Sequence, residues 1–246
     1  MDPLQARERS VTPVGWVETL DDLGGGTVAP WNENPSWSRW DTPGRTLYVG
    51  ETIRSAYAEV LQHFRRPRAG DPVAQLAELL GMTPEEYLAA VDQEQAPLGC
   101  MPRGQFPAGW RHDRALYRVR LPRGGWWIDV EHGDSLTALD SAPGLSQVGF
   151  TEPLTRAHVL GDERRITVAL AEHMRSLRLF DGSEALGVTW NSKLGYGKNW
   201  AFWMRRLDDG LEPAADDPAL VGHGAEIDAH DPDLTYVADR FGIHLH

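Results

Sequence analysis

Three side chains in the segment between residues 39 and 64 are suited to chemistry. They are Arg39, Tyr48 and Glu59. A guanidinium binds phosphate groups through two parallel N–H donors, and a carboxylate stabilises positive charge that develops beside it. A surface arginine, a core tyrosine and a solvated glutamate are the ordinary alternative for the same three residues.

The elements expected to position these side chains are a strand and a helix. Pro43 and Gly44 predict a turn, and residues 46–49 then predict a short strand. Thr52 is suited to be the N-cap of the following helix. Apolar residues recur through that helix at helical spacing and predict one buried face. They are Ile53, Ala56, Tyr57, Val60, Leu61 and Phe64.

A second polar group follows a predicted strand at residues 188–191, with another strand predicted at residues 200–204. Ser192 stands at the exit of the first of these strands, and Lys193, Lys198 and Asn199 follow it. These side chains form the most basic polar patch next to a predicted strand. Such a patch is suited to holding a pyrophosphate group.

Together the two segments resemble the RES family, which is named for an Arg, a Glu and a Ser. The R-W-D-T-P-G, L-Y-V-G and A-x-x-E stretches place Arg39, Tyr48 and Glu59 on the family's first motif, and G-V-T-W-N-S places Ser192 on its third block. The resemblance implies an α+β fold of the ADP-ribosyltransferase type: a split antiparallel β-sheet core with flanking helices and NAD in the cleft. It covers most of the chain outside one insertion.

The family's reaction is attack on the bond between nicotinamide and ribose of NAD, by inorganic phosphate or by water. The resemblance therefore implies an NAD phosphorylase or NAD glycohydrolase, with Arg39, Glu59 and Ser192 catalytic. Glu59 would stabilise the oxocarbenium-like ribose, because breaking this bond leaves positive charge on the sugar. The NAD-binding set is Arg39, Tyr48, Ser192, Lys193 and Asn199. The family's biology implies a toxin restrained by an Xre-type antitoxin.

One expected residue is missing from the opening strand. Family members usually carry an arginine beside an aromatic residue there, whereas this chain has Trp16 and Val17, with Arg7 and Arg9 as nearby substitutes. Two further functions therefore stay open. One is a degenerate RES-like module that binds the nucleotide without turnover, and the other is transfer of ADP-ribose to a protein.

Composition excludes several classes of function. The 246 residues carry a formal net charge of −12, which argues against binding a nucleic-acid backbone. No apolar run approaches the roughly 20 residues that cross a bilayer. The single cysteine, Cys100, cannot form an internal disulfide, so a cytoplasmic location is expected. The sequence leaves the oligomeric state open, a homo-oligomer included.

We expect one domain over residues 1–246, with a helical insertion at residues 66–112. Two short amphipathic helices are predicted in the insertion: the first ends at Gly81, and Thr83 caps the second with Pro84 at its first position. Their spacing resembles a helix-turn-helix, but the segment is acidic where DNA contact needs lysine and arginine. A lid or a partner-docking surface is the preferred interpretation.

The second half predicts further strands and helices. A hairpin is expected from strands at residues 115–121 and 126–130, another edge strand at 151–160, an acidic surface loop at 211–223, and helices at 164–179 and from Pro232 onward. The nine histidines are scattered without a metal-binding pair, so no metal site is predicted.

Overall fold

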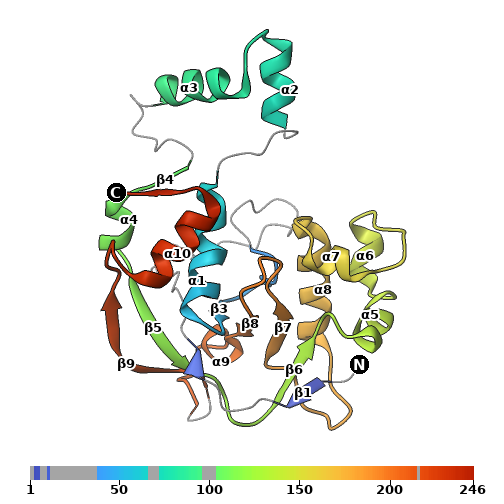
Figure 1. Ribbon diagram of the computed structural model, residues 1–246. Coiled ribbons are helices and arrows are strands. Elements are labelled where there is room, and N and C mark those ends of the chain that lie inside the picture. Colours follow the sequence, from blue (N-terminus) through green and yellow to red (C-terminus); the bar gives the residue numbers. More distant parts are fainter. Residues whose placement is uncertain (1–2, 6–9, 12–37, 66–71, 96–103, 215–216) are drawn as a thin grey trace. The chain divides into compact units, whose positions relative to one another are not determined.

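The computed structural model describes residues 3–5, 10–11, 38–65, 72–95, 104–214 and 217–246 (Figure 1). These residues form an α+β structure with mixed sheets. The chain divides into two compact units, and we describe each by itself. The first comprises residues 1–56 and 117–224, and the second comprises residues 57–116 and 225–246.

A five-stranded sheet forms the centre of the first unit. Its strands, in order across the sheet, are β1 (Pro3–Gln5), β6 (Trp126–Asp129), β7 (Gly187–Asn191), β8 (Lys198–Trp203) and β3 (Thr46–Gly50). Neighbouring strands are antiparallel except β6 and β7, which run parallel. The β7–β8 hairpin and β3 carry most of the residues that the sequence marks for chemistry.

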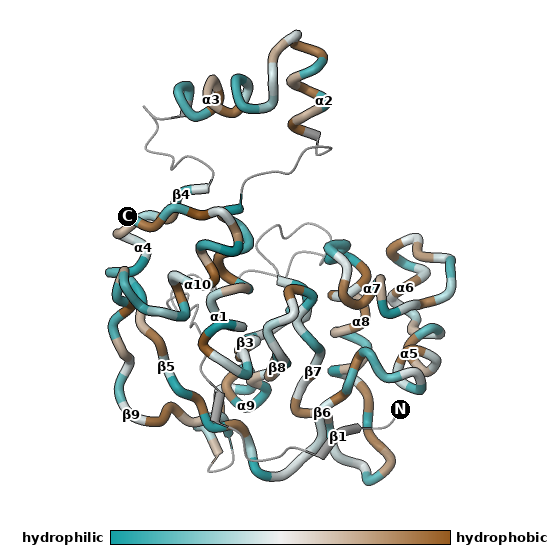
Figure 2. The backbone as a smooth tube through the Cα atoms, in the orientation of Figure 1, coloured by the Kyte–Doolittle hydropathy of each residue, from teal (hydrophilic) through white to brown (hydrophobic). Residues whose placement is uncertain are grey.

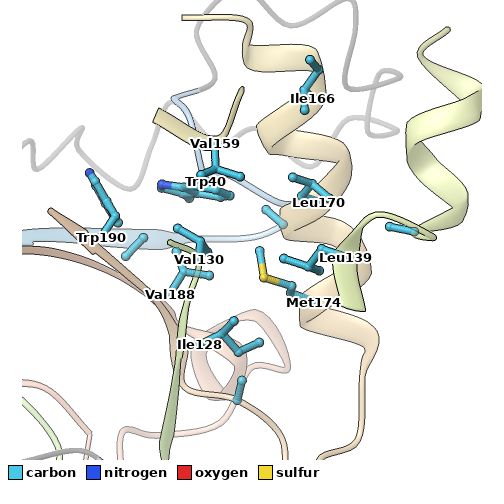
Figure 3. Close-up of a cluster of buried hydrophobic side chains, with 14 of the residues drawn as sticks. Trp40, Ile128, Val130, Leu139, Val159, Ile166, Leu170, Met174, Val188 and Trp190 are labelled. Atoms are coloured by element: carbon cyan, nitrogen blue, oxygen red, sulfur yellow. The ribbon is translucent and has the colours of Figure 1, made fainter. Parts of the chain in front are cut away.

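Five helices accompany this sheet in the first unit: α5 (Gly133–Leu139), α6 (Pro143–Gln147), α7 (Arg156–Leu160), α8 (Arg164–Ser176) and α9 (Arg205–Asp208). In Figure 3, α8 turns Ile166, Leu170 and Met174 toward the cluster that contains Trp40 and Val130. The four-residue spacing of the three α8 side chains makes this stripe, because residues four apart lie on one face of a helix. All three are fully buried.

A second apolar cluster belongs to the same unit. It consists of Val49, Val119, Leu121, Trp127, Trp200 and Phe202. Within β8, Trp200, Ala201, Phe202 and Trp203 are all buried, although successive side chains of a strand point to opposite faces. The sheet is therefore covered on both sides at β8, and its strands hold their register against two apolar layers.

The junction between β3 and α1 (Ile53–Leu61) forms as the sequence predicts. Thr52 Oγ1 accepts a hydrogen bond from the Ser55 backbone N–H at 3.0 Å, and Ser55 Oγ accepts one from the Thr52 N–H at 2.9 Å. Gly50 is required next to this cap, because a Cβ there would lie 2.5 Å from Ser55 Oγ. Helix α1 begins in the first unit and ends in the second.

The second unit has its own buried side chains on α1 and on α10 (Pro232–Phe241). Tyr57, Leu61, Leu234 and Val237 are all fully buried. Its remaining elements are η2 (Gln62–Phe64), α2 (Pro72–Leu79), α3 (Pro84–Gln95), α4 (Ala108–His112) and the parallel pair of β4 (Gln105–Phe106) and β10 (His244–Leu245). The predicted C-terminal helix is confirmed, with Asp231 as its N-cap.

Helices α2 and α3 lie where the sequence predicts two amphipathic helices, and hydrophobic and hydrophilic stretches alternate along both (Figure 2). Gly81 has φ of +70° just after α2. Thr83 and Glu86 form a reciprocal capping box: the Thr83 N–H donates to Glu86 Oε2 at 2.8 Å, and the Glu86 N–H donates to Thr83 Oγ1 at 3.2 Å. These bonds lower the pKa of Glu86.

The expected hairpin of residues 115–121 and 126–130 is wrong, although both strands exist. Strand β5 (Ala115–Arg120) lies in a separate sheet between β2 (Ser10–Val11) and β9 (Ala219–Glu226), whereas β6 pairs with β1 and β7. Trp127 and Ile128 are both buried, so β6 has no solvent-facing side at its centre. Interior strands with a parallel neighbour have this pattern, and their partners are distant in the sequence.

Two other expectations are corrected. Residues 156–160 form α7 instead of an edge strand, because Thr155 and His158 make a capping box at its start. Part of the expected surface loop at 211–223 belongs to β9, whose residues are almost all exposed. Among the described residues, no helix is both long enough and apolar enough to cross a membrane.

Candidate functional site

Arg39 and Lys193 meet at one carboxylate in the first unit. Arg39 Nη2 lies 3.7 Å from Asp162 Oδ1, and Lys193 Nζ donates a hydrogen bond to the same oxygen. Arg39 precedes β3, Lys193 lies in the turn between β7 and β8, and Asp162 lies in the connection between α7 and α8. The fold thus brings two of the predicted phosphate-binding side chains, from distant parts of the chain, to one carboxylate oxygen of Asp162.

Nearby cations stabilise the charged form of Asp162. The hydrogen bond from Lys193 is the main reason that the pKa of Asp162 is lowered, and the charges of Lys193, Arg39 and Arg164 act in the same direction. Two cations from distant segments, Arg39 and Lys193, therefore contact one carboxylate oxygen, in a chain whose net charge is −12. A pair of cations that meets at one oxygen is suited to an anionic ligand.

Tyr48 holds the backbone next to Arg39. Its hydroxyl accepts a hydrogen bond from the Trp40 N–H at 2.9 Å and donates one to Asp41 Oδ1 at 2.8 Å. Burial, together with the nearby Asp41 carboxylate, raises the pKa of Tyr48, so the phenol stays protonated and can donate. The structure therefore gives Tyr48 the role of positioning the segment that carries Arg39.

Replacing Tyr48 with Phe is expected to lower the free energy of unfolding by about 1–3 kcal/mol, because the Trp40 N–H and the Asp41 carboxylate both lose a partner. Urea unfolding followed by circular dichroism measures the change. Tyr236→Phe is the matched control, since Tyr236 is 37% exposed. Equal stability of the two variants would show that the Tyr48 hydroxyl does not hold this segment.

Trp40 and Trp190 anchor the same region in the core. Their ring centroids lie 6.0 Å apart, and Tyr48 meets Trp190 edge-on at 6.3 Å. The Trp203 indole N–H also donates to the Trp40 carbonyl at 3.2 Å. Figure 3 shows both Trp40 and Trp190 at the cluster built on α8. Arg39 is thus the chain neighbour of Trp40, one of the most buried residues of the unit.

The Ser192 turn is fixed by its own backbone. The Ser192 N–H donates to the Gly197 carbonyl at 2.8 Å, and Ser192 Oγ accepts from the Leu194 N–H at 3.2 Å. Gly195 and Gly197 have φ of +80° and +103°, which only glycine adopts readily. Ser192 is 7% exposed. These hydrogen bonds fix the backbone of the turn that carries Lys193.

Two acidic residues bind the backbone at the two ends of this hairpin turn. Neither of them was predicted from the sequence. Glu51 Oε2 accepts from the Lys198 N–H at 3.0 Å. Glu131, whose side chain is 6% exposed, accepts from the Asn191 backbone N–H and, at 2.9 Å, from Asn191 Nδ2, and it also binds Arg156. Each of these contacts joins segments far apart in the sequence, and no local pattern indicates them.

Lys198 and Asn199 lie on β8. Asn199 is 3% exposed and stands opposite Trp190 on one side and Gly50 on the other in the strand register. Lys198 Nζ lies 4.0 Å from Asp129 Oδ2. Of the two lysines near Ser192, Lys193 is therefore the one that shares an anion with Arg39.

Glu59 belongs to the second unit, whereas Arg39, Tyr48, Ser192, Lys193 and Asn199 belong to the first. It lies on α1 between the buried residues Ala58 and Val60 and is itself partly exposed. Gln62 Nε2 donates to the Glu59 carbonyl at 2.8 Å and to Glu59 Oε2 at 3.1 Å. The carboxylate thus accepts a hydrogen bond from η2, the short helix that directly follows α1.

Several sequence expectations fall outside the described residues: Val17 and its missing arginine, the substitutes Arg7 and Arg9, and Cys100. Within the part of the chain that the structure describes, no group of three or more His, Cys, Asp or Glu side chains could hold a metal ion.

Comparison with protein-family models, curated proteins and solved structures found no match to this chain.

Proposed function

We propose that this chain cleaves NAD at the bond between nicotinamide and ribose, on a fold of the ADP-ribosyltransferase type. The observation that carries the proposal is the carboxylate oxygen of Asp162, which Arg39 and Lys193 both contact. A carboxylate oxygen occupies the position between two cations where a phosphate oxygen of NAD would bind. Arginine and lysine are the side chains that proteins use most for phosphate.

The turn after β7 supports the same proposal. Ser192 and Lys193 are adjacent in a turn fixed by backbone hydrogen bonds, and Tyr48 holds the segment of Arg39 from β3. A site that is rigid before the ligand binds loses little freedom on binding. In the proposal, Arg39 and Lys193 bind the pyrophosphate, while Ser192 hydrogen-bonds the nucleotide. Asn199, expected from the sequence to bind it too, is 3% exposed inside β8 and is left out of the proposed contacts.

In this proposal the catalytic carboxylate is Glu59, chosen by its place in the RES motif and not by its position relative to Arg39 and Lys193. As the bond to nicotinamide breaks, positive charge grows on the ribose, and a nearby carboxylate lowers the energy of that transition state. Its assignment comes from the A-x-x-E position on α1 in the RES resemblance. The proposed biology is that of a toxin that depletes NAD and is held inactive by an Xre-type antitoxin.

The acceptor is determined by incubating NAD with the purified chain, with and without inorganic phosphate, and identifying products by mass spectrometry. A phosphorylase yields nicotinamide and ADP-ribose 1″-phosphate, and its rate rises with phosphate. A glycohydrolase yields nicotinamide and ADP-ribose at a rate independent of phosphate. A folded chain that binds NAD and releases no nicotinamide would contradict both and would support the degenerate binding module.

Transfer of ADP-ribose to a protein is a second candidate, favoured by one observation on α2 and the residue that follows it. Leu76, Leu79 and Leu80 are 45%, 81% and 62% exposed, an apolar surface suited to docking an acceptor protein. A mass increase of one ADP-ribose group on a co-incubated protein would distinguish this activity from cleavage of NAD alone.

A further inference from the structure

The Asp162 side chain is far more exposed to solvent than the two cationic side chains that it binds, Arg39 and Lys193. The Asp162 side chain is 86% exposed, whereas the side chains of Arg39 and Lys193 are 17% and 27% exposed. Exposed carboxylates are well solvated, so their ion pairs exchange with solvent and with competing anions at little energetic cost. The protein therefore fixes the cations and leaves the carboxylate replaceable.

The backbone around each group shows the same asymmetry. Arg39 is followed by Trp40, which is fully buried, and Lys193 lies in the hydrogen-bonded turn after β7. Asp162 instead lies in the short connection from α7 to α8, with Gly161 before it and the exposed Glu163 after it. A change of side-chain rotamer at Asp162 disturbs no buried contact.

We propose that Asp162 is an internal competitor for the phosphate-binding position, and that a phosphate group of the ligand displaces its carboxylate from Arg39 and Lys193. The inference rests on the proposed function, because the ligand's phosphate is that of NAD or inorganic phosphate. Inorganic phosphate, or the two-phosphate group of NAD, carries more negative charge and more acceptor oxygens than one carboxylate, so it can offer each cation a separate oxygen, whereas Arg39 and Lys193 share a single oxygen of Asp162. Without the ligand, the Asp162 carboxylate offsets part of the positive charge of Arg39 and Lys193.

The test compares Asp162→Asn with Glu163→Gln by isothermal titration calorimetry. Each variant removes one exposed negative charge from the same connection, but Glu163 pairs with Arg165 instead of the two cations. The probes are inorganic phosphate and ADP-ribose. Asp162→Asn is expected to tighten binding by about two- to fivefold, the range that exposed ion pairs usually carry, with a clearly smaller effect for Glu163→Gln.

A third variant shows whether the gain acts through the proposed cations. Adding Lys193→Met to Asp162→Asn is expected to remove the gain. Tighter binding of phosphate alone would identify inorganic phosphate as the competitor of Asp162, and tighter binding of ADP-ribose alone would identify the nucleotide. Equal affinities of Asp162→Asn and Glu163→Gln for both probes, or weaker binding by Asp162→Asn, would overturn the proposal.

Failure of this inference and failure of the proposed function give different results, because calorimetry with these probes needs no turnover. Nicotinamide release together with equal affinities of the two variants would leave the proposed function and remove the competitor. A selective gain in Asp162→Asn without nicotinamide release by any protein would leave the competitor and remove NAD cleavage. Circular dichroism confirms that the exposed substitutions leave the fold intact.

Discussion

Glu59→Gln is expected to reduce the rate of nicotinamide release from NAD by about 10²–10³-fold, the usual effect of removing one electrostatic contact to a transition state. The substitution keeps the size of the side chain but removes the charge that stabilises the oxocarbenium-like ribose. Its effect should fall on kcat, because the charge on the sugar exists only in the transition state. Chromatographic measurement of nicotinamide over a range of NAD concentrations separates kcat from KM.

The control for this variant is Glu78→Gln, a matched change at an exposed position of α2. Both variants are expected to unfold at the same urea concentration as the parent chain, since Glu59 is partly exposed and glutamine at this position can still accept a hydrogen bond from Gln62. If Glu59→Gln released nicotinamide at the parent rate, Glu59 would not be the catalytic carboxylate.

Trp40→Ala is expected to lower the free energy of unfolding by about 3–5 kcal/mol, as large-to-small substitutions of buried aromatic residues do. Trp40 is 0% exposed, packs against Trp190 at 6.0 Å, and lies in the cluster built on α8. Removing the indole leaves a cavity that this sheet and helix cannot close without shifting. Urea unfolding monitored by circular dichroism measures the loss.

Phe180→Ala is the control for Trp40→Ala, because Phe180 is 79% exposed and should contribute about 0.5 kcal/mol or less. Trp40→Ala should also weaken ADP-ribose binding under conditions where the variant is folded, since Arg39 is its neighbour in the chain. A stability change no larger than that of Phe180→Ala would show that Trp40 does not anchor this region.

The elements with strong local signals were predictable from the sequence. Strand β3, the Thr52 cap and α1 follow from a turn, an N-cap residue and a helical apolar period in one stretch. Helix α8 and the Thr83 capping box were predictable for the same reason. In each case, the residues that determine the element lie within a few positions of one another.

The pairing of strands was not predictable, because it depends on partners far apart in the chain. Residues 126–129 looked like the hairpin partner of β5, yet they pair with β7 across about sixty intervening residues. Strand β9 was not predictable for another reason. Its residues are almost all exposed, so they lack the alternation of apolar and polar side chains that indicates a half-buried strand.

The candidate site was predictable as residue types and not as contacts. The sequence indicated Arg39 and Lys193 as separate phosphate-binding candidates, and the structure brings them to one oxygen of Asp162. Nothing in the sequence around Asp162 marks it, because its partners lie in two other segments. Tyr48 was expected to contact the nucleotide, whereas the structure shows its hydroxyl bound to Trp40 and Asp41.

The central claim is that this chain breaks the bond between nicotinamide and ribose, and the mass balance of NAD tests it most directly. Purified chain is incubated with NAD, and NAD and nicotinamide are quantified together by chromatography over time. One nicotinamide is expected to appear for each NAD lost, over many turnovers per chain. NAD that remains intact with a folded, nucleotide-binding chain, or that is lost without release of nicotinamide, would contradict it.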